Sequence, residues 1–443
     1  CMKIITSYNV RLKTEYISAM KQTVMLYTDA VCFYMDVILE EWNTFAGLST
    51  NEAVLCAERL SHATTAHPAP KYDFDGRFPK FPCYLRRAAI SSAFGKCCAY
   101  ISSLANWEKL DPAVRKKAPG RPRITMEMPA FYKGNMFVRT GDYTARLKLF
   151  FRNDWQYVDV GLRKCDVDYL LRHCGSRKES SPVLRHCHKV WELCFSYEED
   201  RMLNKTPVSG QRILAVDLGI HNPCTCCVMT SDGTVLGRHF HKAPVEEDSL
   251  NHKLGKIRKA QRQGSQRIPK KWASIHGSNT SISRKTADFI ISMAVLYNVD
   301  VIVMEYLDTS GKKHGSGKQR LHMWRKAAIW KQTELQAHRL GIRVSRVCAY
   351  NTSRLAFDGS GRVLRGREAD LGSYSICQFR TGKIYNCDLN ASYNIGARYF
   401  IREILKPFSE KEKLPVLAKV PDCGKRSTCT LASLIRLNAA LAA

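Results

Sequence analysis

Residues 211–223 read QRILAVDLGIHNP. The apolar run from Ile213 to Val216 leads directly into Asp217, and Gly219 follows two places later. A short apolar run bounded by a turn signal predicts a buried strand. This strand would end by presenting a carboxylate at a turn. The role of that carboxylate depends on whether other carboxylates of the chain lie close to it in the fold.

Two further carboxylates stand at the edges of apolar elements. VDVIVMEYL, residues 299–307, predicts a strand with Glu305 at its end, and Asp388 opens the helix predicted for DLNASYNIGARYFIREIL. Three converging acids would repel one another, but Mg²⁺ prefers hard oxygen ligands, and a metal pair can activate water in phosphodiester cleavage. We therefore expect Asp217, Glu305 and Asp388 to be catalytic residues that hold two Mg²⁺ ions, which Mn²⁺ could replace.

Each acid on its own also has a structural explanation. Asp388 at a helix start would cap the helix and interact favourably with its dipole, and Asp217 close to a glycine is a turn signal. Glu305 is harder to explain in this way, because Glu favours neither strands nor turns. The three acids together, in this order in a basic chain, favour the metal site.

The chain is strongly basic. Its 443 residues include 69 Lys and Arg against 40 Asp and Glu, a formal net charge of +29. Such a charge predicts a polyanionic partner, and counterion release favours nucleic acid over a secreted cationic protein or a membrane-surface binder. No apolar stretch reaches the roughly 18 residues of a membrane span, and the start shows no signal-peptide pattern. We expect a cytoplasmic protein that does not enter a membrane.

The 18 cysteines do not predict a zinc site. Most stand in apolar surroundings, where a reduced cysteine packs as a small hydrophobic residue. The cluster CTCC at 224–227 has adjacent cysteines that cannot both reach one tetrahedral metal without strain. We expect the protein to be free of zinc.

The periodicity changes along the chain. Residues 2–11 predict a strand, and apolar residues at three and four spacing predict helices from about 14 to 110. After the basic linker RKKAPGRPRI, residues 115–124, the period becomes two, which predicts antiparallel strands of a small sheet or barrel. Beyond a boundary near 204–211 strands alternate with helices, an order that suits a ribonuclease H-like fold.

The three acidic motifs carry a resemblance to a known family. ILAVDLGIHNP, VDVIVMEYL and CDLNASYNIGARY resemble the RuvC nuclease motifs of the transposon-associated TnpB proteins and of the compact type V CRISPR effectors. The match covers about 210–400 in order, and DxNxxxNI is its most specific part. At this length the miniature type V-F, Cas twelve f-like effectors are the most similar class. The resemblance places the catalytic Asp, Glu and Asp of the family on Asp217, Glu305 and Asp388.

The resemblance implies a multidomain α+β architecture. An N-terminal wedge-type β-barrel with a helical recognition insertion would precede a RuvC, ribonuclease H-like α/β nuclease domain. The implied domains are a wedge domain at 2–13 and 120–203, a recognition lobe at 14–119, a nuclease domain at 211–345 and 384–420, and a zinc-ribbon-like target-loading insertion at 346–383.

The last of these segments departs from the family. Its members usually carry two C-x-x-C pairs there, whereas Cys348, Cys377 and Cys387 do not form two pairs at ligand spacing. We expect a degenerate, zinc-free ribbon.

Basic residues near the nuclease motifs are candidates for nucleic-acid contacts. A run between the first two motifs would lie along a guide–target duplex through phosphate contacts, although such runs are usually solvated helix faces. The candidates are Lys253, Lys256, Arg258, Lys259, Arg262, Arg267, Lys270, Lys271, Arg320, Arg325, Arg354 and Arg367. Arg354 or Arg367 could neutralise charge on the scissile phosphate.

The implied function is RNA-guided DNA cleavage in prokaryotic antiviral defence. A guide RNA would select double-stranded target DNA beside a short flanking motif, form an R-loop, and direct one Mg²⁺-dependent endodeoxyribonuclease site to both strands. The type V-F resemblance implies a homodimer on one guide, whereas TnpB-like proteins suggest a monomer. Two alternatives stay open: a guide-independent, structure-selective nuclease, and an RNA-guided DNA binder that does not cut.

Overall fold

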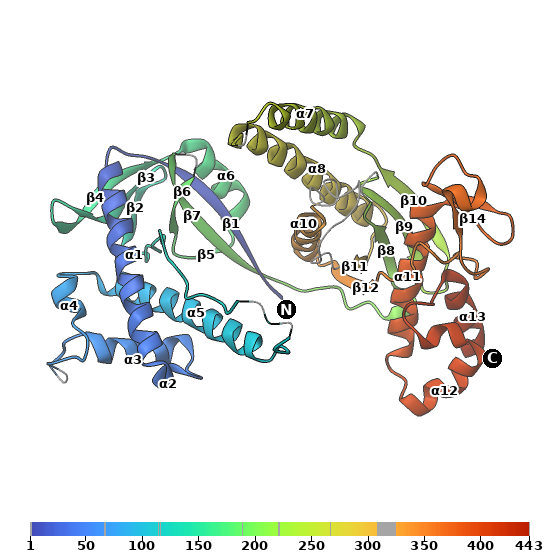
Figure 1. Ribbon diagram of the computed structural model, residues 1–443, viewed down its shortest axis with the longest axis horizontal. Coiled ribbons are helices and arrows are strands. Elements are labelled where there is room, and N and C mark those ends of the chain that lie inside the picture. Colours follow the sequence, from blue (N-terminus) through green and yellow to red (C-terminus); the bar gives the residue numbers. More distant parts are fainter. Residues whose placement is uncertain are drawn as a thin grey trace. The chain divides into compact units, whose positions relative to one another are not determined.

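The structure is a computed structural model that describes residues 2–442 except 66–67, 114, 116, 188, 220–221, 266 and 308–324. The chain divides into two compact units. One comprises Ile5–Glu199, and the other Asp200–Ala443 together with Cys1–Ile4. Figure 1 follows the chain through both units, and within the described residues no helix is long and apolar enough to cross a membrane.

The first half of the N-terminal unit is helical, as the spacing of its apolar residues predicts. Ser49 and Glu52 form a capping box at the start of the third helix, which satisfies amide groups that the helix leaves free. A single core joins these helices to the sheet that follows. The helices are α1 (Ile17–Glu40), α2 (Trp42–Phe45), α3 (Thr50–Ser61), α4 (Phe74–Arg77) and α5 (Cys83–Glu108).

The expected β-barrel is not closed among the described strands. Seven strands form one sheet in the order β2-β3-β4-β1-β7-β5, and β6 pairs with β7. Helix α1 packs against this sheet, and Phe150 N donates to Thr23 Oγ1 of the helix at 2.8 Å. Because a helix buries the apolar face, the sheet does not need to close on itself. The strands are β1 (Met2–Lys13), β2 (Phe137–Gly141), β3 (Thr144–Phe151), β4 (Asp154–Leu162), β5 (Lys178–Glu179), β6 (Val183–Cys187) and β7 (Val190–Arg201), with helix α6 (Lys164–Cys174) between β4 and β5.

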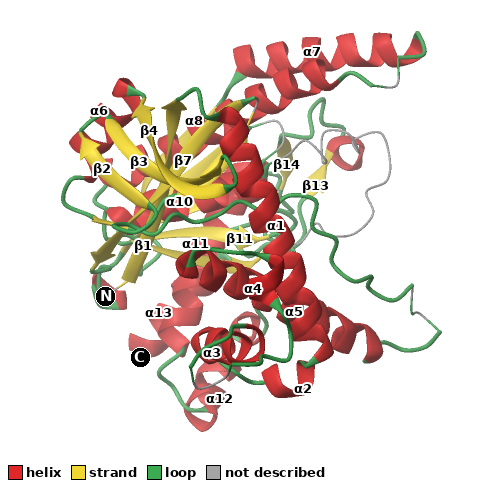
Figure 2. Ribbon diagram, turned by 90° about the vertical axis from the view of Figure 1, so that its left-hand side faces the viewer, coloured by secondary structure: helices red, strands yellow, loops and turns green. Residues whose placement is uncertain are grey.

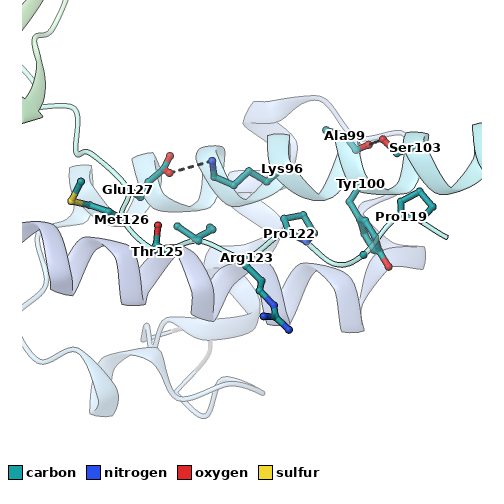
Figure 3. A pocket seen from close by; sticks show the side chains of 12 residues that line it. Lys96, Ala99, Tyr100, Ser103, Pro119, Pro122, Arg123, Thr125, Met126 and Glu127 are labelled. Carbon is teal, nitrogen blue, oxygen red and sulfur yellow. Dashed lines mark hydrogen bonds and ion pairs between the residues drawn. The ribbon is translucent and has the colours of Figure 1, made fainter. Parts of the chain in front are cut away.

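The Pro- and Gly-rich linker lies along the exposed half of α5. The last fully buried residue of this helix is Cys97, although the helix continues to Glu108. A cavity of about 520 Å³ separates its later turns from residues 119–127 (Figure 3). An ion pair of 3.2 Å between Lys96 and Glu127 joins the segment that follows the linker to the helix.

The C-terminal unit is built on a five-stranded sheet in the order β10-β9-β8-β11-β12. Strands β8, β9 and β10 form an antiparallel meander, and β11 pairs in parallel with β8 on one side and with β12 on the other. Helices stand before β11 and before β12, in line with the alternation of strands and helices that the sequence pattern predicts. The strands are β8 (Arg212–Asp217), β9 (Cys224–Thr230), β10 (Val235–His241), β11 (Val301–Tyr306) and β12 (Arg343–Cys348).

Helices cover both faces of this sheet. Ile213, Ala215, Val301 and Val303 face a core that α11 and α13 complete. The residues between them along each strand face a second core with α8 and α10. Helices α7 and α8 lie side by side as a hairpin with a small apolar seam of its own (Figures 1 and 2). The helices are α7 (Pro244–Arg262), α8 (Pro269–Leu296), α10 (Lys326–Arg339), α11 (Cys387–Leu405), α12 (Glu410–Lys419) and α13 (Leu431–Ala442).

The zinc-ribbon-like segment has a small hydrophobic core of its own. Strands β13 (Leu364–Arg365), β14 (Ile376–Gln378) and β15 (Ile384–Asn386) form a small antiparallel sheet. Its core contains Ala356, Val363, Phe379 and the thiols of Cys377 and Cys387. Apolar packing thus occupies the centre of this segment.

Candidate active site

Strand register brings Asp217 and Glu305 to the same edge of the sheet. Val216 of β8 pairs with Met304 of β11 in a parallel ladder, so Asp217 and Glu305 are the next residues on neighbouring strands. Side chains alternate between the two faces of a strand. Since Ala215 and Val303 face the core that α11 completes, both carboxylates lie on that same face.

Asp388 stands in the first turn of α11, which covers this face. Gly396, two helical turns later, packs so closely on β8 that an added Cβ would lie 3.3 Å from the Cβ of Ala215. Asp388 accepts from Asn222, which stands between β8 and β9, and its charge acts on Asp217, so all three predicted acids meet at one edge of the sheet.

The charges of the three acids interact. Burial raises the pKa of Asp217 well above its usual range, and the nearby charges of Glu305 and Asp388 raise it further. Burial also raises the pKa of Glu305, while the Thr352 hydroxyl that donates to its carboxylate and the charge of Arg398 oppose the rise. A cluster of this kind favours a bound cation, because a cation stabilises the ionised form of every member.

Neutral donors hold two of the carboxylates. Asn222 Nδ2 donates to Asp388 Oδ2 at 2.9 Å, and Thr352 Oγ1 donates to Glu305 Oε1. Thr225 pairs with Asp217 across the β8–β9 ladder and lies on the same face. Its hydroxyl is buried and has no hydrogen-bond partner among the described residues.

The donor set fits Mg²⁺ by its chemistry. Carboxylate oxygens are the ligands that Mg²⁺ prefers, and the orphan hydroxyl of Thr225 would suit a metal-bound water. Among the described residues, however, no three His, Cys, Asp or Glu side chains stand close enough together to hold a metal ion. In this conformation the carboxylates of Asp388 and Glu305 are bonded to Asn222 and Thr352.

Arg365 is a site residue that the sequence analysis missed. Its charge lowers the pKa of Asp217 against the stronger effects that raise it. One guanidinium nitrogen donates to Ser353 O, while the buried Nε has no partner among the described residues. Arg365 and Arg354 line a cavity of about 360 Å³. The sequence analysis named Arg354 and Arg367 instead, because both lie in the segment that precedes Asp388.

A row of polar residues on α11 holds the segment that carries Thr352. We call this row the α11 polar stripe; it consists of Asn390, Asn394, Arg398 and Arg402, spaced four residues apart. Such residues share one side of a helix.

The bonds of the stripe run along residues 345–357 in the direction opposite to the helix. Asn390 accepts from Phe357 N at 2.8 Å, and Asn394 Nδ2 donates to Thr352 O at 2.8 Å. Arg398 Nη1 donates to the carbonyls of Cys348 and Tyr350, and Arg402 Nη1 to that of Arg346. Thr352, and through it Glu305, is therefore positioned by α11, the helix that carries Asp388.

The other predicted nucleic-acid contacts are mostly exposed cations of the α7–α8 hairpin. Lys253 is half-buried, and its Nζ donates to Ser278 Oγ at 2.5 Å. Arg325 is exposed and donates to Thr280 Oγ1. Arg320 lies outside the described residues, as does the side chain of Arg367. The exposed cations of the hairpin are Lys256, Arg258, Lys259, Arg262, Arg267, Lys270 and Lys271.

Asp217→Asn should raise the free energy of unfolding at pH 7 to 8 in a buffer without divalent cations. The raised folded-state pKa means that folding favours protonated Asp217. This contribution to stability is complete below the ordinary pKa of about 3.9 and is lost as the pH rises through the raised value. Each pKa unit corresponds to about 1.4 kcal/mol. Thermal unfolding of both proteins in EDTA, from pH 4 to 8, measures the difference.

The matched control is Asp248→Asn, which removes an exposed carboxylate of α7. The free energies of unfolding of the wild type and of Asp217→Asn should converge as the pH falls towards 4. Added Mg²⁺ should stabilise the wild type more than Asp217→Asn. A stability difference that is the same at pH 4 and pH 8 would contradict the assigned charge cluster.

Comparisons with known proteins match the two parts of the chain differently. The model of the Aq_aa04 family matches residues 5–151. The uncharacterized protein aq_aa04 of Aquifex aeolicus (strain VF5) is 29% identical over 121 residues, which covers 24% of this chain and 67% of that protein. The family match is confined to the N-terminal unit.

Solved structures match most of the chain. A cryo-EM structure of a Cas12f1–sgRNA–target DNA complex is 14% identical, covers 84% of this chain and 81% of that chain, and has a TM-score of 0.54. CasPhi-2 (Cas12j) bound to crRNA and phosphorothioate-DNA is 11% identical, covers 88% of this chain and 90% of that chain, and has a TM-score of 0.49. The resemblance to compact type V CRISPR effectors is thus confirmed at the level of the fold.

Proposed function

Because the chain has the fold of a compact type V CRISPR effector, we propose that it is an RNA-guided DNA endonuclease with a single RuvC-type site. One observation carries the proposal. Asp217, Glu305 and Asp388 meet on the α11 face of a sheet ordered β10-β9-β8-β11-β12, with a raised pKa at Asp217. Fixed carboxylates that repel one another cost stability, so a protein that only binds DNA has no use for them.

Asp217, Glu305 and Asp388 would hold two Mg²⁺ ions, which Mn²⁺ could replace. When bound, the ions would supply an activated water and stabilise the leaving oxygen. Side chains of the protein would orient the metal ligands and neutralise charge on the substrate. Asn222 and Thr352 orient the carboxylates of Asp388 and Glu305. Arg365, whose Nε has no partner in the described part of the chain, would neutralise charge on the scissile phosphate.

The guide RNA and the target DNA paired with it would also contact surfaces beyond this site. The Cas12f1 structure is a complex with an sgRNA and target DNA. The exposed cations of the α7–α8 hairpin suit phosphate contacts with a guide–target duplex, and base pairing would supply the sequence specificity. The sheet and helices of the N-terminal unit would read a short flanking motif. With one site available, the two DNA strands would be cut in turn.

The protein purified from a host that carries its native neighbouring DNA should retain one defined RNA. Base pairing can direct cleavage only if such an RNA is bound. Extraction and sequencing of the bound nucleic acid tests this, and a constant region joined to a variable segment is the expected result. The mass of the purified complex, measured by light scattering, separates one protein copy per RNA from two.

Heterogeneous host RNA, or none, would contradict guided cleavage. The same protein would then be tested on branched DNA, since a structure-selective nuclease needs the acidic site but no large RNA. Target binding without any cleavage in Mg²⁺ or Mn²⁺ would instead support an RNA-guided binder.

A further inference from the structure

A second cavity in the C-terminal unit lies beside the later turns of α11. Its volume is about 450 Å³, and none of the three acids lines it. Six cationic side chains from β12, α11, α12 and the following loop converge on it, against one carboxylate, Glu410. The cationic residues are Arg346, Arg398, Arg402, Lys406, Lys413 and Arg426.

Arg398 gives this cavity a fixed positive charge. Its side chain is only 4% exposed. Besides Cys348 and Tyr350, its guanidinium donates to Ser427 O at 3.0 Å and to Cys429 O at 3.2 Å. Burial lowers the pKa of Arg398 from its usual value, but an arginine remains protonated in proteins. Backbone carbonyls satisfy its hydrogen bonds without neutralising its charge.

Carboxylates neutralise only part of the remaining charge. Arg402 pairs with Glu403 at 2.8 Å, and Lys413 pairs with Glu410 at 2.7 Å. Lys406 reaches Glu403 only at 4.0 Å and is largely exposed. Arg426 has no carboxylate partner in the described ranges, so the cavity keeps an excess of positive charge.

Among the described residues, the guanidinium of Arg346 contacts aromatic rings and pairs with no carboxylate. It lies 3.7 Å from the centre of the Trp330 ring. A cation above an aromatic face keeps its charge and is held in place by the ring. Arg346 therefore adds a positioned charge at the β12 side of the cavity.

We propose that this cavity binds the phosphodiester backbone of a single-stranded nucleic-acid segment. Guanidinium and ammonium groups around a concave site are the donors that phosphate oxygens take. The volume is in the range of small-ligand pockets, so it would admit a nucleotide or two of a strand and not a duplex.

The position of the cavity on α11 relates it to the acidic site. At about 1.5 Å per residue, Arg398 lies roughly 15 Å and Lys406 roughly 27 Å along the helix from Asp388. A strand that rises about 3.4 Å per nucleotide would cover that length with about four to eight nucleotides. The proposal rests on the proposed function for the presence of nucleic acid, but it does not need cleavage.

The test replaces two exposed cations in the variant Lys406→Ala/Arg426→Ala; among the described residues, only the 4.0 Å pair of Lys406 with Glu403 involves either of them in an ion pair. Its matched control, Lys411→Ala/Lys419→Ala, removes two exposed lysines of α12 that do not line the cavity. The affinity of the full chain for labelled single-stranded DNA and RNA oligonucleotides is measured in EDTA between 50 mM and 500 mM salt. Both variants lose the same net charge. The comparison therefore separates binding in the cavity from the general electrostatic attraction of a basic protein for nucleic acid.

The cavity variant should lower the slope of log affinity against log salt by about 1.4, since each contact with a single strand contributes about 0.7. Its affinity at 0.15 M salt should fall about tenfold. The control should change the slope by less than half as much. A loss with DNA alone, with RNA alone, or with both supports the cavity and identifies the strand that it holds.

Equal losses in the two variants, or no loss in the cavity variant, would overturn the proposal. Neither result depends on cutting, so the proposed nuclease activity would stand or fall separately.

Discussion

Asp217→Ala should reduce the rate of target-DNA cleavage by about 10⁴-fold, the scale on which loss of one essential acid acts in a hydrolase. The charges of Glu305 and Asp388 both act on Asp217, so its removal takes away one of the three ligands of the proposed metal site. Binding to guide and target should remain nearly unchanged, because the exposed cations lie on other elements. Single-turnover cleavage of a matched target, measured from 0.1 to 20 mM Mg²⁺, tests the first expectation, and filter binding in EDTA tests the second.

Two variants make this result specific. Asp248→Asn, on the exposed side of α7, should cut like the wild type. Arg365→Ala should slow single-turnover cleavage by about 10²- to 10³-fold, the usual effect of removing one donor that stabilises charge in the transition state. Full activity of Asp217→Ala would exclude Asp217 from the site. If higher Mg²⁺ restored activity, Asp217 would tune metal affinity and would not be essential.

Arg398→Met should lower the free energy of unfolding of the C-terminal unit by about 3 to 5 kcal/mol. Methionine fills much of the volume but donates nothing, and the carbonyls of Cys348, Tyr350, Ser427 and Cys429 lose the guanidinium. A buried carbonyl that loses its donor costs about 1 to 3 kcal/mol. Thermal and urea unfolding measure the loss.

Arg398→Lys is the informative companion variant. It keeps the charge, but a single ammonium group cannot reach four carbonyls at once. A free energy of unfolding between those of the wild type and Arg398→Met would show that the several N–H donors of the guanidinium contribute to stability beyond its charge. A loss below about 1 kcal/mol in Arg398→Met would contradict the anchoring role of the α11 polar stripe.

The convergence of the acids could be predicted because strand ends and helix starts are readable in sequence. Apolar runs locate β8 and β11, and the ends of parallel neighbouring strands meet at one edge of a sheet. The position of Asp388 could be predicted because it stands at the start of an amphipathic helix. The placement of these three residues depends mainly on local pattern, and their roles as metal ligands stay a prediction.

The open N-terminal sheet and Arg365 depend on contacts that local pattern does not contain. Period-two strands look alike in a barrel and in an open sheet; here the sheet shares its core with α1. Arg365 stands in a glycine-rich segment with several arginines, and tertiary packing selects the one that lies near Asp217.

The α11 polar stripe, in contrast, left a signal in the sequence. Asn390, Asn394, Arg398 and Arg402 recur every four residues in a helix whose other residues are mostly apolar. Polar residues buried at such a period indicate partners along one line.

The spacing of this row makes α11 intolerant of changes in length. An inserted or deleted residue between Asp388 and Arg398 would turn everything after it by about 100° around the helix axis. Asn394 and Arg398 would then face away from residues 348–355, although every side chain would still be present. Related proteins that preserve this helix should therefore tolerate substitutions in it far more often than insertions or deletions. Distances between these positions would be a better guide to remote kinship than the percentage of identical residues.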